Sequence, residues 1–121
     1  MGLFDGVPYD YSAEANRLLF TAGACPLDAR GRVVAPGDLE AQTRQTVENL
    51  LLALAERGVD ARSLVKTTIF VVASERAALV CAWEVIAESL GRCPSTLVGV
   101  SLLGYPDQLV EIEAIAHVDR E

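Results

Sequence analysis

The sequence predicts an α+β fold in two layers, with a single β-sheet covered on one face by two helices. Two segments carry apolar side chains at helical spacing, and each of them is followed by a glycine. Other segments are rich in β-branched and aromatic residues, or alternate apolar with polar side chains. The predicted order is β-β-α-β-α-β-β, and a chain of 121 residues is expected to form one domain, residues 1–121.

Two strands are predicted before the first helix, at residues 9–15 and 18–24. Residues 26–31 (PLDARG) then form a loop, because proline, aspartate and glycine each favour turns. Asp38 is the predicted N-cap of the first helix, and Gly58 is its predicted stop. The apolar residues of this helix recur at its spacing: Leu39, Val47, Leu50, Leu51 and Leu54.

The second half of the chain predicts a strand at 65–72, with Val65, Thr67, Ile69 and Val71 on one face. Ser74 is the predicted cap of the second helix, which Gly91 ends, and Trp83 on that helix is expected in the core. A strand at 95–102 and a turn at 104–107 (GYPD) lead into the last strand, 109–116.

The last strand, LVEIEAIA, has two very different faces. One carries only Val110, Ile112, Ala114 and Ala116, and the other alternates apolar residues with Glu111 and Glu113. If the helices cover the first face, the second face is either exposed to solvent or covered by another subunit. An uncovered face with this much apolar surface predicts a homo-oligomer, and the alternative is a monomer with a half-polar outer sheet face.

Composition excludes several classes of function. The net charge of −7 disfavours nucleic acid and anionic lipid as partners. The sequence shows neither a signal peptide nor an apolar run long enough for a membrane span. Cys25, Cys81 and Cys93 lie far apart, which favours reduced thiols and a cytoplasmic location. With His117 as the single histidine, we expect no metal site.

Several segments, in the right order from about Pro8 to the C-terminus, resemble the Rid family (RidA/YjgF-like proteins, also labelled L-PSP endoribonucleases). These segments are FTAG (20–23) with PLD (26–28), EAQTRQTVENL (40–50), LVKTTIFV (64–71), TLVGV (96–100) and LVEIEAIA (109–116). The resemblance implies a chorismate-mutase-like fold and a homotrimer whose sheets pack into a central barrel, with clefts between subunits. It also implies hydrolysis of reactive imines and enamines of small metabolites, without metal or cofactor.

The family chemistry uses two side chains. A carboxylate orients or deprotonates water, and an arginine binds the carboxylate of the substrate. By resemblance, Glu111 takes the place of the water-handling glutamate. Gly23 matches the glycine whose backbone approaches the ligand, and Tyr9 matches the cleft tyrosine. The alternative role for Glu111 is a hydrogen bond across the subunit seam.

The position aligned with the ligand-binding arginine is occupied by Ser95, followed on the same strand by Thr96. Serine donates one neutral hydrogen bond, whereas a charge-assisted contact to a carboxylate is worth about 1.5–3 kcal/mol. Arg92 could swing inward or stay solvated, and Cys81 stands where the family commonly has asparagine. We therefore expect weak activity on 2-imino acids.

Three functional hypotheses follow from the sequence. The first is a metabolite-binding homotrimer that hydrolyses an imine, enamine or related labile intermediate with water held by Glu111. The second is a non-catalytic binding or regulatory module of the same fold. The third is the ribonuclease activity attached to part of the family, which the acidic balance and the lone histidine disfavour.

Overall fold

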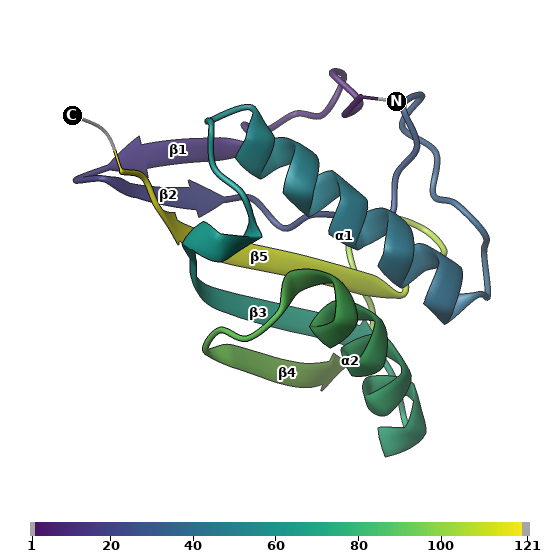
Figure 1. Ribbon diagram of the computed structural model, residues 1–121. Helices are drawn as coiled ribbons and strands as arrows, with labels where there is room; N and C mark the ends of the chain where they lie inside the picture. Colours follow the sequence, from purple (N-terminus) through teal and green to yellow (C-terminus); the bar gives the residue numbers. More distant parts are fainter. Residues whose placement is uncertain (1, 120–121) are drawn as a thin grey trace.

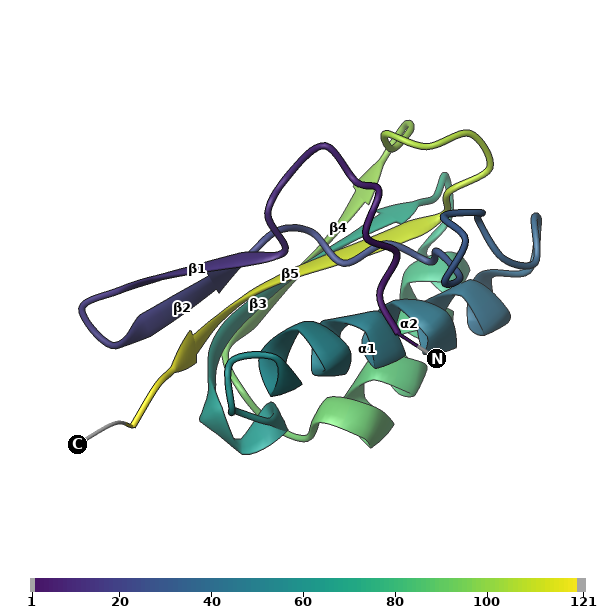
Figure 2. The ribbon, with the colours of Figure 1, turned by 90° about the horizontal axis from the view of Figure 1, so that it is seen from above.

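The computed structural model describes residues 2–119 and has two layers, a single sheet and two α-helices that lie together on one side of it (Figures 1 and 2). The elements are β1 (Ser12–Ala15), β2 (Leu18–Thr21), α1 (Leu39–Ala55), the 3-10 helix η1 (Ala61–Ser63), β3 (Leu64–Val72), α2 (Arg76–Leu90), β4 (Ser95–Val100) and β5 (Val110–His117). The predicted α+β class and element order are confirmed. Residues 1, 120 and 121 of the predicted domain lie outside the described residues.

The sheet has five strands in the order β1-β2-β5-β3-β4 (Figure 1). β3 and β4 are parallel and are joined through α2, while the other neighbours are antiparallel. The last strand of the chain therefore lies in the middle of the sheet, between β2 and β3. This position brings β5 against segments that lie far from it in the sequence.

Both strands before α1 are shorter than predicted. Asn16 and Arg17 adopt positive φ values of 52° and 63° and make the tight connection between β1 and β2. After Thr21 the regular pairing stops, because the chain bends away toward α1. Only Ala24 rejoins β5, through a pair of backbone hydrogen bonds with Ile112.

The two helices begin differently. Asp38 caps α1 as predicted, since its carboxylate accepts a hydrogen bond of 3.0 Å from the backbone N–H of Ala41. The predicted Ser74 cap is wrong, because α2 starts one residue later with Glu75 at the cap position and no side-chain cap hydrogen bond. Gly58 and Gly91 follow the helices with φ values of 76° and 74°, as helix-ending glycines do.

The core lies between the helices and the inner face of the sheet. The apolar face predicted for the last strand is confirmed, with Val110, Ile112, Ala114 and Ala116 all buried. They pack with apolar side chains from both helices and from β3: Val47, Leu50, Leu54, Ile69, Val71, Ala82, Ile86 and Leu90. Burial of this apolar surface is the main force that holds the helices on the sheet.

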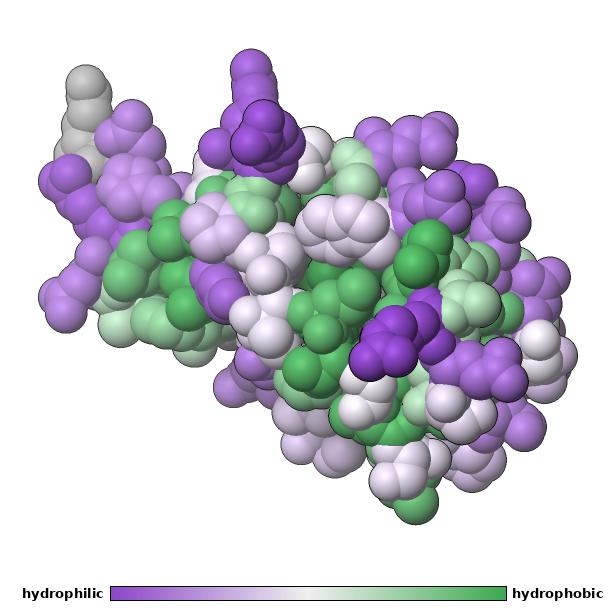
Figure 3. Space-filling model, turned by 90° about the horizontal axis from the view of Figure 1, so that it is seen from below, coloured by the Kyte–Doolittle hydropathy of each residue, from purple (hydrophilic) through white to green (hydrophobic). Residues whose placement is uncertain are grey.

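Two apolar side chains are exposed, and one of them, Trp83, was expected in the core. Val65 is 43% exposed, because the pairing of β3 with β5 shifts between Leu64 and Lys66 and leaves Val65 as the extra residue of a bulge. Trp83 is 38% exposed on the outer side of α2, near the exposed Val80. Figure 3 shows the molecule from below, and on this side apolar areas lie among hydrophilic ones.

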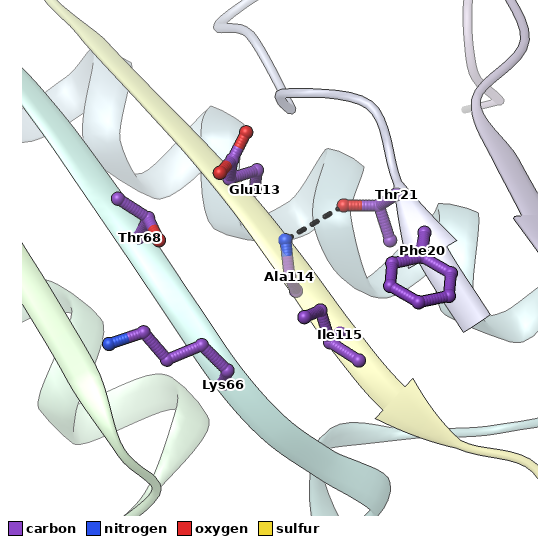
Figure 4. Close-up of a pocket in the computed structure, with 7 residues that line it drawn as sticks. All are labelled: Phe20, Thr21, Lys66, Thr68, Glu113, Ala114 and Ile115. Carbon is purple, nitrogen blue, oxygen red and sulfur yellow. Dashed lines mark hydrogen bonds between the residues drawn. The ribbon is translucent and has the colours of Figure 1, made fainter. Parts of the chain in front are cut away.

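No element among the described residues covers the outer face of the sheet, which lies opposite the helices (Figure 2). Phe20 of β2 is 43% exposed there, next to Ile115 of β5 in the pairing. Figure 4 shows these two side chains with Lys66, Thr68 and Glu113 around a shallow hollow of about 170 Å³. We name this surface the outer sheet face.

Candidate functional site

A cavity of about 450 Å³ lies where β5 begins, at the edge of the outer sheet face. Its walls come from the segment before β1, the segment after β2, and the loop before β5. The lining residues are Pro8, Tyr9, Ala22, Gly23, Cys25, Gly104, Tyr105, Gln108 and Glu111. Three of the residues proposed from the sequence, Glu111, Gly23 and Tyr9, therefore line one cavity.

Glu111 is the charged group of this cavity. It pairs with Phe70 on β3, so that strand alternation directs its side chain to the face opposite the core. The Gln108 amide donates a hydrogen bond of 3.1 Å to Oε1 of Glu111, and the Cys25 thiol donates to the same oxygen over 3.5 Å. Among the described residues no hydrogen bond reaches Oε2, which leaves that oxygen for a ligand or a water molecule.

Gly23 is required by the position of Glu111. A Cβ atom placed on Gly23 would overlap Oε2, Cδ and Cγ of the Glu111 side chain. The missing side chain at residue 23 therefore makes room for the carboxylate to lie against the backbone. This contact gives a physical reason for glycine at the position that the family resemblance singled out.

The loop that carries Gln108 is held by α1. The buried side chain of Gln42 donates to the carbonyl of Asp107 over 2.9 Å and accepts from the N–H of Leu109 over 2.8 Å. Gln108 lies between these two anchors, and its own Oε1 accepts from the N–H of Tyr105 over 3.1 Å. These hydrogen bonds fix the orientation of the amide that holds Glu111.

A second amide on α1 holds the other wall. Asn49 donates from Nδ2 to the carbonyls of Cys25 and Leu27, each over 2.8 Å. Sequence reasoning missed Gln42, Asn49 and Gln108. The available signal was the pair of amides spaced seven residues apart on the apolar side of a helix, since buried amides need partners.

The Cys25 thiol lies beneath the carboxylate. Burial, together with the negative charge of Glu111, raises the pKa of Cys25 to about 12. The thiol therefore stays protonated and acts as a hydrogen-bond donor at neutral pH. In the described structure it supports Glu111 and is not activated as a nucleophile.

Tyrosine side chains form the mouth of the cavity. The hydroxyl groups of Tyr9 and Tyr105 lie 3.2 Å apart, and the rings of Tyr9 and Tyr11 meet edge to face with centroids 6.0 Å apart. Burial, followed by the hydrogen bond with Tyr105, raises the pKa of Tyr9. Tyr9 therefore presents a neutral phenol to the cavity.

Ser95 does not face this cavity. It pairs with the buried Thr67, and the two hydroxyl oxygens lie 2.6 Å apart on the side of the helices. Its neighbour Thr96 points to the outer sheet face, where it accepts a hydrogen bond of 2.6 Å from Lys66. Neither side chain lines the Glu111 cavity in this chain.

The other residues considered from the sequence lie elsewhere. Cys81 is half-buried on α2 and is not part of the cavity lining. Arg92 is exposed after α2, and His117 is exposed at the end of β5. Within residues 2–119 no group of three or more potential ligands could hold a metal ion, and no helix is long and apolar enough to cross a membrane.

Comparisons with known proteins agree with the fold and with the motifs. The family model described as endoribonuclease L-PSP matches residues 6–118. A RutC family protein of Pyrococcus horikoshii is 34% identical over 111 residues, which cover 91% of this chain and 86% of the relative. The 3-aminoacrylate deaminase RutC of Acinetobacter baylyi is 32% identical over 113 residues, 92% of this chain and 87% of that enzyme.

A solved structure gives the same result at the level of the fold. YyfA of Yersinia pestis, a protein of unknown function of the conserved Rid family, superimposes with a TM-score of 0.83 and 31% identity. The superposition covers 92% of this chain and 88% of YyfA. By sequence and by fold, the chain belongs to the L-PSP endoribonuclease family, in which the Rid/YjgF and RutC proteins are grouped.

Proposed function

We propose that this protein hydrolyses a small reactive imine or enamine, with Glu111 as the residue that holds and deprotonates the attacking water. The observation that carries the proposal is the fixed carboxylate. Its Oε1 is held by Gln108 and Cys25, and its Oε2 is left toward a cavity of about 450 Å³. The relative from Acinetobacter baylyi, a deaminase of 3-aminoacrylate, supports the same class of reaction.

The proposed reaction uses the protein's own groups. Oε2 of Glu111 accepts a proton from water as the water oxygen forms a bond to the carbon of the C=N group, and the π electrons move to nitrogen. That proton then passes to the nitrogen, which gives a carbinolamine. Glu111 next transfers the hydroxyl proton of the carbinolamine to the same nitrogen, the C–N bond breaks with its electron pair leaving on nitrogen, and a carbonyl compound and ammonia or an amine leave. An enamine first takes up a proton on carbon and loses one from nitrogen, which gives the imine.

We further propose that the protein works as a homotrimer in a reducing cytoplasm. The outer sheet face has apolar side chains such as Phe20 and Ile115, and Leu102, in the loop after β4, is 76% exposed. Burial of this face against two other copies would complete the wall of the Glu111 cavity. All three cysteines are free, which suits a reducing compartment.

Light scattering tests the trimer and should give about three times the 12.9 kDa mass of the chain. A stable single chain at micromolar concentration would contradict the trimer.

The test of the activity is hydrolysis of freshly generated imines, followed by ammonia release. Wild-type protein should accelerate hydrolysis, and Glu111→Gln should lower turnover by about a hundredfold, in the range of general base catalysis. Glu113→Gln is the matched control, because that carboxylate lies two residues further on the same strand and outside the Glu111 cavity. Turnover that survives Glu111→Gln would contradict the proposed role.

The second candidate is a non-catalytic binding module of the same fold. The neutral residues Ser95 and Thr96 favour it over a 2-imino acid deaminase, since neither replaces an arginine that grips a carboxylate. A folded assembly that binds ligand in the cavity but hydrolyses none of the imines would support this candidate. Hydrolysis of 2-iminopropanoate at the rate of an arginine-containing relative would contradict the argument from these two residues.

A further inference from the structure

We propose that the Glu111 cavity takes a small organic cation whose charge lies on nitrogen, a protonated imine or amine without a carboxylate group. The nitrogen would lie next to Oε2 of Glu111, and the organic group would lie against Tyr9 and Tyr105. This inference deepens the proposed function, on which it rests, by naming the charge class of the substrate. It is carried by the charges and contacts of the cavity.

The carboxylate of Glu111 has no cationic partner among the described residues. The ion pairs found among the described residues join Arg32 to Asp28, Arg44 to Glu40 and Arg62 to Asp60, and none of these six residues lines the cavity. The two donors to Oε1, the amide of Gln108 and the thiol of Cys25, are both neutral. A half-buried carboxylate in this state is stabilised by any cation that enters.

The cavity wall also favours a cation over an anion. Its described lining contains no lysine, arginine or histidine, and Glu111 is its one charged residue. The rings of Tyr9 and Tyr105 stand at the mouth of the cavity, and tyrosine rings attract ammonium-type cations. The net charge of −7 adds a field over the whole molecule that attracts cations and repels anions.

A ligand carboxylate would meet the opposite conditions. The cation nearest along the sheet on the outer face, Lys66, lines the separate shallow hollow and donates to Thr96. Among the groups that one chain supplies, a carboxylate placed in the Glu111 cavity would therefore meet the negative charge of Glu111 and no positively charged donor. Since a protonated imine is the form that water attacks most readily, the same carboxylate would favour both binding and reaction.

The experiment measures the binding of three ligands built on the same aromatic ring. Benzylamine carries an ammonium group, phenylacetate carries a carboxylate, and phenylglycine carries both. None of them contains a C=N bond, so binding is measured whether or not the protein hydrolyses imines. Wild-type protein should bind benzylamine at least tenfold more tightly than phenylacetate, with phenylglycine weaker than benzylamine, as followed by calorimetry or NMR titration.

Glu111→Gln should weaken benzylamine binding by about tenfold to a hundredfold, the usual range for loss of one charged contact. Glu88→Gln, on the exposed side of α2, is the control, since it removes the same unit of charge away from the cavity. If Glu111→Gln fails to fold, the relative affinities of the three ligands for wild-type protein still test whether the cavity prefers a cation.

Phenylacetate that binds as tightly as benzylamine would overturn the inference, and would indicate a cation brought into the cleft by another subunit. Benzylamine that shows no binding at its highest soluble concentration would overturn it as well. Tight benzylamine binding that depends on Glu111, together with no imine hydrolysis, would support the ligand class while contradicting the proposed enzymatic function.

Discussion

The two helices cover the same face of the sheet but contribute in different ways. The buried side of α1 includes polar residues, among them Gln42 and Asn49, whose amides hold the two loops around Glu111. The buried side of α2 is entirely apolar, with Ala82, Val85, Ile86 and Leu90. This difference indicates that α1 positions the candidate site, whereas α2 mainly supports the fold. Substitutions on each helix can separate these roles.

The largest loss of stability is expected on α2. Ile86→Ala should lower the free energy of unfolding by about 2–5 kcal/mol, because it leaves a cavity beside the sheet. The remaining folded protein should bind ligand as the wild type does. Urea unfolding at fixed protein concentration measures the first effect, with the exposed Val80→Ala as control. Loss of ligand binding in folded Ile86→Ala would contradict the division between the helices.

A smaller loss of stability, but a larger loss at the site, is expected on α1. Gln42→Leu leaves the N–H of Leu109 without its partner, at a cost of about 1–3 kcal/mol, whereas the freed carbonyl of the exposed Asp107 can accept from water. The loop with Gln108 should lose its fixed position, so that ligand affinity falls even in folded protein. Unchanged affinity would show that Gln108 is held by other contacts.

The helix starts provide a third comparison. Asp38→Ala should destabilise the protein by about 1 kcal/mol, because it removes the hydrogen bond to the N–H of Ala41 at the start of α1. Ser74→Ala, just before α2, should change stability by less than about 0.5 kcal/mol, since no side-chain cap is formed there. Thermal unfolding of the two variants measures the difference, and equal losses would contradict it.

The smallest expected effect is a pH dependence of stability that comes from Cys25, the residue whose carbonyl accepts a hydrogen bond from Asn49. Its pKa is raised from 9.0 to about 12 by burial and by Glu111, so the unfolded chain loses the thiol proton first as pH rises. The stability tied to the protonated thiol is therefore complete below about pH 9 and declines above it, by about 0.8 kcal/mol at pH 9.5. Cys25→Ser should remove this part of the pH dependence, and Cys81→Ser, on α2, is the matched control. A decline that persists in Cys25→Ser would assign it to other groups.

Much of the fold could be predicted from the sequence, because the relevant signals are local. The alternation of residues 109–116 identified the buried face of β5, and Asp38 identified the start of α1. The exposure of Val65 could not be predicted, because a bulge depends on the pairing of β3 with β5 rather than on either strand alone. Trp83 was misplaced for a similar reason, since helical spacing does not say how much of the helix surface a neighbour covers.

The site could be predicted only in part. The motifs led to Glu111, Gly23 and Tyr9, and the structure brings these three residues to one cavity. The direction of Ser95 could not be predicted, because a shift of one residue moves a side chain to the other face of a strand. The register of β4 on β3 decides it, and Thr96 rather than Ser95 faces outward.

The sequence alone determined that helices form one layer and strands the other, which face of β5 is buried, and that a carboxylate lies on the opposite face. These properties follow from the spacing of side chains along single segments. Only the tertiary structure decided that Gln42, Asn49, Gln108 and Cys25 meet around that carboxylate. Their contacts join residues far apart in the chain, and such contacts exist only once the strand order, the register and the packing of α1 are fixed.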